Sequence, residues 1–578
     1  MEASLQSLSR LQRTGIALRR RRIGFAALAL ASAAALLALM AATLFPAGFD
    51  MTGGVMLCLF AFTLPWTTVG FWNAVIGFSL MSFARDPAGR VAPHLRSITG
   101  EEPIASSTAL LVCIRNEDTR RVSSNLEWMI EGLLATDEAR WFHLYILSDS
   151  NQPAIAAEEE KIAAALVDRF GAALTVTYRR RDASSGFKAG NIRDFCERWG
   201  PLHRFAIVLD ADSVMTPDAM LRLVRIMQAQ PHIGILQTLV TGLPSGSAFA
   251  RIFQFGMRLG MRSYTLGAAS WQGDCGPYWG HNAILRLAPF TEHCRLPALP
   301  GTPPLGGHVL SHDQLEAVLM RRAGYEVRVL PDEEGSWEEN PPSLTEFIRR
   351  DLRWCQGNMQ YFHFLATPGL LPVSRCQLGL AIAMYLSAPA WLAFMLLGVL
   401  REAPFRMDLG VTIFVVTLAM ALAPKLATLA DVLARSRLRR AYGGTLRIVT
   451  SVVLEFLVSM LIAPVSAVAV TLFILGLPFG RRVSWNAQQR DAEALSFRSA
   501  VRRLWPQTML GCILAAWLWQ VAPGAVWYWL PLVLGLAGSI PLAVMTAHPL
   551  AGRALAAAGL CRVPNADPTY LVASERTH

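Results

Sequence analysis

The sequence predicts an α/β domain with a mostly parallel sheet, inserted into a polytopic α-helical membrane protein with about eight membrane segments. Two observations carry this prediction. The 578 residues are 53% hydrophobic and 16% charged, with a mean hydropathy of +0.35, which is too apolar for an ordinary soluble protein. Residues 85–375, in contrast, are mixed in polarity and alternate strand-like with helical patterns, and apolar stretches flank them on both sides.

The alternation within 85–375 follows a β-α order. Strand-like runs cover 107–114, 142–147, 174–178 and 205–209. Helical patterns begin at Thr119 and cover 153–169, 187–198 and 217–229. This order predicts a mostly parallel sheet with helices on both faces. Ligands of such sheets bind beyond the carboxyl ends of the strands, so the residues that follow each run are candidates for a site.

Basic clusters beside the apolar stretches predict the orientation in a membrane by the positive-inside rule. Residues 1–22 are basic, whereas the turn between the first two apolar stretches holds Asp50 and no Lys or Arg. The predicted divisions are 1–84 (cytoplasmic tail and two spans), 85–375 (cytoplasmic domain), 376–548 (transmembrane translocation domain) and 549–578 (cytoplasmic tail). The predicted spans are 23–45, 54–83, 376–400, 409–430, two within 448–480, 505–521 and 525–547.

The apolar run 448–480 is too long for one upright span. A single helix would reach roughly 50 Å, against a hydrocarbon core of ~30 Å. We expect a hairpin broken near Pro464, so that the basic loops 431–447 and 481–504 both lie inside. Glu455 is an ionisable group within this run and is therefore a candidate for a translocation path, although it could also face a polar cavity.

Charge and cysteine content exclude several classes of protein. The net charge is +11, but the Arg clusters lie beside apolar segments and no basic stripe is interleaved with aromatic residues. We therefore expect no nucleic-acid partner. The nine Cys form no Cys-x-x-Cys pair, so neither a zinc site nor a disulfide framework is predicted.

Asp210 and Asp212 directly follow the strand-like run 205–209. Two carboxylates at i and i+2 beside a bend can hold a hard divalent cation that bridges two phosphates. The alternative is an Asx turn or a helix cap near Pro217. Because polar residues also follow the other strand-like runs, we favour the metal site.

Further candidates follow the neighbouring runs. Asn116, Glu117 and Asp149 could accept hydrogen bonds from a nucleobase or ribose, or could cap turns. Lys188 and Asn191 open a helical pattern, where the lysine suits a phosphate or is part of a solvated helix start. Arg179, Arg180 and Arg181, which precede this helical pattern, could reach a diphosphate or be exposed.

The second half of this region holds a candidate base and a candidate leaving-group motif. Asp313 opens a helical pattern at 313–322, where it could deprotonate an attacking hydroxyl or simply favour the helix dipole. Arg350, Arg353 and Trp354 precede the next apolar stretch. Arg there can stabilise a departing diphosphate and Trp can stack on a sugar, or both can lie at a membrane interface.

Aromatic and amide side chains between these motifs could bind a sugar acceptor. Trp279, His281 and Asn282 are close in sequence, and Trp271 precedes them. Aromatic rings stack on sugar rings, and imidazole and amide groups bind hydroxyls. The alternative is that these residues are ordinary core.

Together, these motifs resemble the inverting, processive glycosyltransferases of family 2, which include cellulose, chitin and hyaluronan synthases. The family pattern joins a base- and ribose-binding Asp, an Asp-x-Asp, a later Asp base and a Gln-x-x-Arg-Trp, and the match covers about 107–355. The chain is most similar to the branch that makes osmoregulated periplasmic glucans. The stretches that carry this resemblance are Ile114–Asp118, Leu147–Ser150, Gly186–Asn191, Leu209–Ser213, Tyr278–Asn282, Ser311–Asp313 and Arg349–Asn358.

The chain departs from the wider family at two positions. Arg350 stands where the family has the Gln of Gln-x-x-Arg-Trp, and His312 stands where an acidic residue commonly precedes the base. Both departures argue against a cellulose or hyaluronan synthase. They leave open whether Arg350 contacts the acceptor, the diphosphate or neither.

The resemblance implies a GT-A type domain that transfers glucose from UDP-glucose, with Mg2+ or Mn2+, to a β-1,2-linked glucan with inversion. It implies that Asp210 and Asp212 hold the metal, that Asp149 and Glu117 hold the uridine and that Asp313 is the base. Arg353 and Trp354 would stabilise the leaving group and the acceptor end. The other residues of the predicted site are Asn116, Lys188, Asn191 and Arg350 toward the donor, and Trp279, His281 and Asn282 toward the acceptor.

The resemblance also implies a multi-pass protein of the bacterial inner membrane that is surrounded by lipid and exports the glucan as it grows. A periplasmic protein of the same pathway would be its partner, and acyl carrier protein is a candidate accessory. Two alternatives stay open from the residues. One is a membrane synthase of another polysaccharide, and the other is a non-enzymatic transporter with a UDP-sugar-sensing domain.

Overall fold

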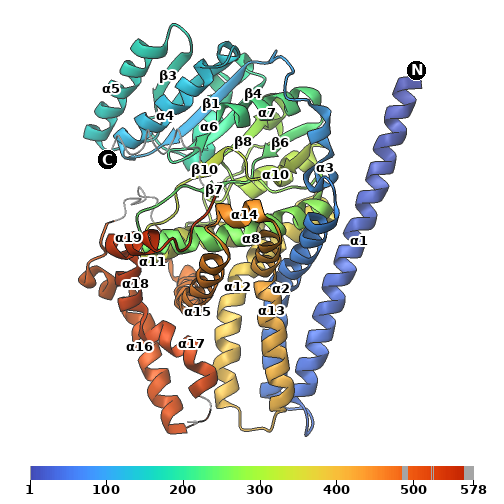
Figure 1. Ribbon diagram of the computed structural model, residues 1–578, viewed down its shortest axis with the longest axis vertical. Helices are drawn as coiled ribbons and strands as arrows, with labels where there is room; N and C mark the ends of the chain where they lie inside the picture. The colour runs from blue at the N-terminus through green and yellow to red at the C-terminus, as the bar shows by residue number, and fades with distance from the viewer. Residues whose placement is uncertain (1, 484–492, 522–523, 525, 565–578) are drawn as a thin grey trace.

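The structure is a computed structural model that describes residues 2–483, 493–521, 524 and 526–564, with side chains from residue 15 onward. Figure 1 shows an α/β domain at one end and long helices that extend away from it, with α8 (Ala248–Gln272) and α11 (Leu344–Met359) running between the two. The predicted fold class, an α/β domain within a helical membrane protein, is confirmed.

The α/β domain is built on a seven-stranded sheet in the order β3-β2-β1-β4-β8-β6-β9. The strands are β1 (Thr108–Ile114), β2 (Phe142–Ser148), β3 (Thr175–Arg180), β4 (Phe205–Asp210), β6 (Ile233–Gln237), β8 (Ala283–Arg286) and β9 (Glu326–Val329). All neighbouring pairs are parallel except those of β8, which runs antiparallel to β4 and β6. A three-stranded sheet, β5-β10-β7, lies beside it, with β5 at Val214–Met215, β7 at Thr241–Gly242 and β10 at Ser336–Glu338.

Helices cover both faces of the large sheet because the strands are apolar on both sides. Leu110 of β1 packs in one buried cluster and the next residue, Leu111, packs in the other. One face is covered by α4 (Thr119–Leu134), α5 (Pro153–Phe170) and α7 (Pro217–Ala229). The other is covered by α6 (Phe187–Arg198), α9 (Leu287–His293) and α10 (Asp313–Arg322).

Among the described residues, five helices are long and apolar enough to cross a membrane. They are α1 (Glu2–Leu44, with the apolar part from Gly15), α2 (Met51–Phe83), α12 (Pro372–Leu400), α13 (Met407–Ala434) and α15 (Thr445–Gly476). A sixth candidate is the pair α17 (Val526–Ala537) and α18 (Ser539–Ala547), which is bent by 61°. The described residues therefore hold fewer candidate spans than the eight segments predicted. The remaining helices are α3 (Pro87–Val91), α14 (Ser436–Ala441), α16 (Phe497–Val521) and α19 (Pro549–Ala557).

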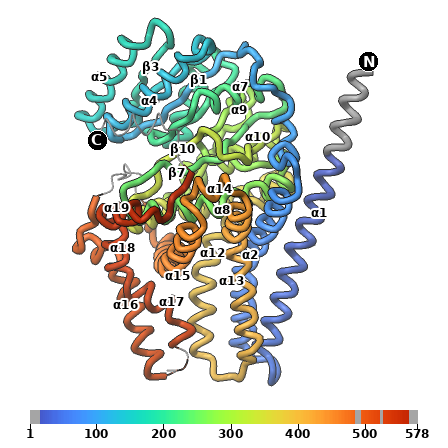
Figure 2. Tube along the Cα trace, in the orientation of Figure 1, coloured from blue at the N-terminus to red at the C-terminus, as the bar shows by residue number. Residues whose placement is uncertain are grey.

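The predicted hairpin at Pro464 is wrong, because α15 is one continuous helix through this proline. Near its start, Ser451 Oγ accepts a hydrogen bond from the Cys561 backbone N–H at 2.8 Å. Just beyond its end, the Val483 N–H donates to Gln356 Oε1 of α11 at 3.0 Å. Helix α15 contacts both α8 and α11 and lies beneath them in Figures 1 and 2.

The two ends of the basic loop 481–504 both contact α11. Val483 does so through Gln356, and Arg503 forms an ion pair with Glu346 at 2.8 Å. Residues 484–492 of this loop lie outside the described residues. Glu455 of α15 is buried and forms an ion pair with Lys425 of α13 at 2.6 Å. A carboxylate that is paired in this way holds α13 against α15.

Trp271 is not part of an acceptor surface. Its ring is buried and stacks on Phe25 of α1 with the ring centroids 4.3 Å apart, and its Nε1–H donates to Asn73 Oδ1 of α2 at 2.9 Å. The residue therefore joins three helices, α1, α2 and α8. The expectation that Trp271 contributes to sugar binding is corrected by these contacts.

Candidate active site

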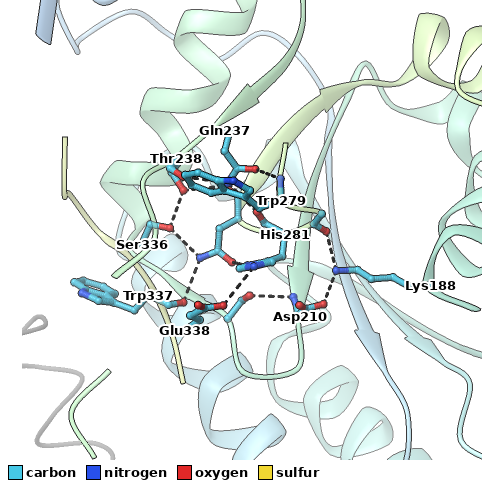
Figure 3. A network of polar contacts seen from close by, with 12 residues as sticks. Lys188, Asp210, Gln237, Thr238, Trp279, His281, Ser336, Trp337 and Glu338 are labelled. Atoms are coloured by element: carbon cyan, nitrogen blue, oxygen red, sulfur yellow. Dashed lines mark hydrogen bonds and ion pairs between the residues drawn. The ribbon is translucent and has the colours of Figure 1, made fainter. Parts of the chain in front are cut away.

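The predicted polar residues meet at the carboxyl edge of the large sheet. Asp210 ends β4, and Lys188 is in the first turn of α6, whose N-terminus faces the same edge. The Lys188 ammonium donates to the Asp210 carboxylate and, at 2.7 Å, to the Gly280 carbonyl oxygen (Figure 3). Burial alone would lower the pKa of Lys188, but the Asp210 carboxylate outweighs it and the pKa lies above its ordinary value. Lys188 is therefore a permanent positive charge at this edge.

A bend after β4 brings a second carboxylate to the same place. The Asp210 backbone N–H donates to Ser213 Oγ at 3.0 Å, which holds the turn, and Asp212 is buried beside it. Burial raises the pKa of Glu338 above its ordinary value, His281 and Arg350 oppose that shift, and the charges of Asp212 and Asp210 add to it. The carboxyl groups of Asp210, Asp212 and Glu338 are therefore close enough to influence one another's charge.

This arrangement fits a divalent cation that is also held by a ligand. Among the described residues, no group of three or more His, Cys, Asp or Glu side chains is arranged to hold a metal by itself. Two carboxylates can instead anchor a cation whose remaining oxygen ligands are phosphates and water. The surplus of negative charge around Asp210, Asp212 and Glu338 is what such a cation would neutralise.

Asp313 begins α10 and lies close to the same glycine that Lys188 contacts. A Cβ built at Gly280 would lie 3.4 Å from Asp313 Cβ and 3.6 Å from His312 Cε1. Gly280 has φ +82°, a left-handed conformation that favours glycine. The close approach of this backbone places the Asp313 side chain, the Lys188 ammonium and the end of β4 around one point.

Buried hydrogen bonds hold the loop that contains Gly280 (Figure 3). Gln237, at the end of β6, accepts from the Trp279 backbone N–H at 2.9 Å and donates to the His281 carbonyl oxygen at 3.0 Å. The Asn282 amide donates to Ser336 Oγ at 2.9 Å and to the Trp337 carbonyl oxygen at 3.2 Å. Asn282 is therefore buried and occupied by protein partners, so it supports the loop and does not face an acceptor.

His281 stands between an amide and a carboxyl group. Because the Asn282 amide nitrogen is used as a donor, its Oδ1 faces His281 Nδ1 at 3.1 Å, which assigns the N–H to Nδ1. His281 Nε2 then faces Glu338 Oε2 at 3.3 Å. One further proton is needed for that contact to be a hydrogen bond. Burial favours a proton on Glu338, because it raises the pKa of that carboxyl group.

Asp149, at the end of β2, is held by an arginine. Arg181 Nε and Nη2 donate to the two carboxylate oxygens of Asp149 at 2.7 and 2.6 Å, and both side chains are buried. Arg181 also donates to the carbonyl oxygens of Ser185 and Phe187, just before and at the start of α6. A bidentate pair of this kind fixes the direction of the carboxylate. Arg181 is therefore neither exposed nor directed at a diphosphate.

Two predicted residues shape the loops around Asp149. Asn116 has φ +53°, and its side-chain oxygen accepts from the Asn151 and Gln152 backbone N–H groups at 3.1 Å each. Glu117 lines a small recess with Thr119 and Glu159. Asn116 therefore joins the end of β1 to the turn after β2.

Asn191 of α6 is buried inside the domain. Its amide donates to the Leu147 carbonyl oxygen at 2.9 Å and its Oδ1 accepts from Arg179 at 2.7 Å. Arg179 also pairs with Asp194 at 3.0 Å. The two residues pin α6 to β2 and β3, so Asn191 supports the position of Lys188 and does not face a ligand.

Helix α11 brings the last predicted residues to this side of the domain. Arg350 and Arg353 are buried, whereas Trp354 is 48% exposed. The Arg350 guanidinium carbon lies 4.8 Å from the centroid of the Trp354 ring and 6.0 Å from that of Phe253. Arg350 therefore stacks between two aromatic rings, and Trp354 presents its ring outward from a helix that is otherwise well packed.

Sequence reasoning missed three residues that organise this site: Gln237, Glu316 and Glu338. Gln237 contacts Trp279 42 positions away, Glu316 contacts His312 four positions away, and Glu338 faces His281, which is distant in sequence. None of the three lies in a motif with a fixed spacing. Gln237 carried one local signal, since a buried glutamine at the end of an otherwise apolar strand needs polar partners.

Comparisons with known proteins agree with this geometry. The profile of glycosyl transferase family group 2 matches residues 205–561. Proteins named glucans biosynthesis glucosyltransferase H are similar over most of the chain. That of Xylella fastidiosa (strain 9a5c) is 36% identical over 545 residues, which cover 91% of this chain and 85% of the relative. That of Xanthomonas oryzae pv. oryzae (strain MAFF 311018) is 37% identical over 548 residues, covering 91% and 84%.

Other relatives are longer than this chain. The protein of the same name from Pseudomonas aeruginosa (strain LESB58) is 37% identical over 519 residues, which cover 85% of this chain and 59% of the relative. Among solved structures, a mannosyltransferase from Pyrobaculum calidifontis in complex with GDP-Man and Mn2+ is 14% identical, with a TM-score of 0.37. The match covers 62% of this chain and 99% of that one. That likeness is too low to carry an argument about the site.

Proposed function

The chain belongs to glycosyl transferase family group 2 and, within it, to the glucans biosynthesis glucosyltransferases, and we propose that it polymerises glucose from UDP-glucose into a β-1,2-linked glucan with inversion at each transfer. The observation that carries the proposal is the convergence of Lys188, Asp210 and Asp313 around Gly280 at the carboxyl edge of the sheet. Such an edge is where ligands of parallel sheets bind.

In this proposal Asp313 is the general base. It takes the proton of the acceptor hydroxyl, whose oxygen attacks C1 of glucose while the bond from C1 to the UDP oxygen breaks on the opposite face. Asp210 and Asp212 would hold Mg2+ or Mn2+, which when bound neutralises charge on the diphosphate. Lys188 and Arg353 would add positive charge for the departing UDP.

The donor nucleotide would bind over the ends of β1 and β2. Asp149 would accept hydrogen bonds from the uridine, with Glu117 beside it, and Asn116 would hold the loop between them. Because Arg181 occupies both carboxylate oxygens of Asp149 in a bidentate pair, it would orient the carboxylate that the nucleotide meets.

We expect Arg181→Met to raise the KM for UDP-glucose about tenfold, a loss of roughly 1.4 kcal/mol, with a smaller change in kcat. Removing the arginine leaves Asp149 buried without its cation, so the carboxylate loses its orientation. Arg180→Met is the matched control, because the Arg180 side chain next to it in sequence is exposed. Steady-state kinetics would separate the two variants. Equal KM values for Arg181→Met and the parent protein would contradict the assignment.

The acceptor end of the glucan would lie between the 279–281 loop and α11. Trp354 presents an exposed ring, which can stack on a sugar. Trp279 and His281 would contact the acceptor from the other side. The long apolar helices below would pass the product across the bacterial inner membrane to a periplasmic partner. The catalytic domain and both termini would lie in the cytoplasm.

The proposal is tested by incubating the purified protein with UDP-[14C]glucose and Mg2+ in detergent and in lipid vesicles. Radiolabelled polymer with β-1,2 linkages is the expected product, and EDTA should abolish its formation. UDP-N-acetylglucosamine serves as a competing donor. Polymer of another sugar or linkage would identify a different polysaccharide synthase. UDP-glucose binding without turnover, even with added glucan primer, would favour the sensing alternative.

A further inference from the structure

The base Asp313 is adjacent in sequence to a buried ion pair that the proposed mechanism does not use. His312 and Glu316 are 6% and 2% exposed, and His312 Nδ1–H donates to Glu316 Oε2 at 2.8 Å. The two residues are one helical turn apart at the start of α10. A buried pair this close to a base needs a reason, because burying two ionisable groups is costly.

The outer edge of the His312 ring faces the site. A Cβ built at Gly280 would lie 3.6 Å from His312 Cε1 and 3.7 Å from Nε2, and 3.4 Å from Asp313 Cβ. The imidazole and the side chain of the base therefore stand side by side against one glycine. The Glu316 carboxylate holds the other ring nitrogen, Nδ1.

We infer that His312 and Glu316 form a positioning dyad, in which the imidazolium of His312, held by Glu316, balances and orients the carboxylate of Asp313. The sheet edge already gathers the carboxyl groups of Asp210, Asp212 and Glu338. A further carboxylate beside Asp210 and Asp212 needs a cation next to it, and Lys188 is already paired with Asp210. The inference rests on the proposed function through the role of Asp313.

The electrostatics of the pair support this assignment. Burial alone would lower the pKa of His312, but the charge and hydrogen bond of Glu316, together with the charge of Asp313, outweigh it, and the pKa lies above its ordinary value. The other groups that act on the dyad are Lys188, Cys196, Tyr278, Cys294, Asp313 and Tyr361. Of these, only Lys188 is a cation, and it opposes the charge on His312.

A cavity behind the dyad offers a route by which it can exchange protons with water. Glu316 lines a cavity of about 250 Å³ between α6, α9 and residues 295–309. Arg193, Glu197 and His308 also line this cavity, and their exposed side chains place its mouth at the surface. His312 can therefore follow the pH of the medium although its side chain is buried.

The test compares Glu316→Gln and His312→Gln with the parent protein between pH 6 and 8.5. Glutamine keeps the shape of Glu316 and can still accept a hydrogen bond from Nδ1. It carries no negative charge, however, so the effect of burial dominates and the pKa of His312 falls. We expect kcat of Glu316→Gln to fall about tenfold at pH 8 and to recover toward pH 6. His312→Gln cannot recover, because it carries no charge at any pH. Glu197→Gln is the control, because Glu197 lines the same cavity but is exposed and pairs with Arg193 on the surface.

A second measurement does not depend on turnover. Exchange of the imidazole C2 proton for deuterium, followed by mass spectrometry of the peptide that contains His312, reports the midpoint of its titration. We expect a midpoint above 6.5 in the parent protein and below 6.5 in Glu316→Gln. A parent midpoint below 6.5, or equal midpoints in the two proteins, would overturn the dyad. If the parent makes no polymer from UDP-glucose, the proposed function fails, while this exchange still decides the charge on His312.

Discussion

Asp313→Asn should lower kcat for polymer synthesis by about 10²–10⁴-fold, because general base catalysis contributes a factor of that size. The asparagine is isosteric but cannot accept the proton of the acceptor hydroxyl at neutral pH. Binding of UDP-glucose should be unchanged within about twofold, since Asp313 is assigned to the acceptor side and the donor contacts come from other elements. Turnover of labelled UDP-glucose and isothermal titration with UDP-glucose would measure the two quantities separately.

The variant should fold, because the structural role of Asp313 is small. Its carboxylate lies in the first turn of α10, where interaction with the helix dipole contributes about 0.3–1 kcal/mol. Asp218→Asn is the matched control: Asp218 is an exposed carboxylate in the first turn of α7. Both variants should unfold at nearly the same temperature, while only Asp313→Asn loses activity. Polymer synthesis at the parent rate by Asp313→Asn would exclude it as the base.

The soluble domain was largely predictable because its helices begin at local signals. Residues 187–198 and 217–229 were expected to be helical, and α6 and α7 have those bounds. Gly186, with φ +73°, precedes α6, and the Thr216 side chain accepts from the Ala219 N–H ahead of α7. A capping residue lies within a few positions of the helix end that it stabilises, so it can be recognised from the sequence alone.

The membrane helices were less predictable, because proline does not end a helix there as it commonly does in a soluble domain. A proline within a helix removes one hydrogen bond, and this suggested a break at Pro464. In this chain the prolines within helices include Pro65, Pro389, Pro424, Pro464, Pro506 and Pro531. Neighbouring helices can satisfy the freed groups. The Lys425–Glu455 pair joins residues 30 positions apart, and no spacing rule reveals such a partner.

The candidate site also has a part that could be predicted from the sequence and a part that could not. The placement of Asp149 and Asp210 at strand ends follows from the strand pattern, so sequence reasoning could locate them. It could not tell that Asn191 and Asn282 would be buried with protein partners, because an amide in a motif looks the same whether it faces inward or outward. The direction of a side chain depends on the packing of elements distant in sequence.

Gly267→Ala should destabilise the protein strongly, because the added methyl group separates two helices whose backbones touch. A Cβ at Gly267 of α8 would lie 1.9 Å from the Asn73 carbonyl oxygen of α2. One turn away the relation is reversed, since a Cβ at Gly77 of α2 would lie 1.9 Å from the Ser263 carbonyl oxygen of α8. The obstructing atoms are backbone, so no rotamer change can make room.

The expected loss for Gly267→Ala is about 2–3 kcal/mol, at the upper end of the range for overpacking, and Gly77→Ala should lose a similar amount. Gly260→Ala is the control on the same helix, because nothing lies within 4 Å of the Cβ position there. That variant should gain up to about 1 kcal/mol from helix propensity. Thermal unfolding in detergent, followed by tryptophan fluorescence, would measure all three. If Gly267→Ala and Gly260→Ala unfold at the same temperature, the close contact of α2 and α8 does not hold the catalytic domain to the membrane helices.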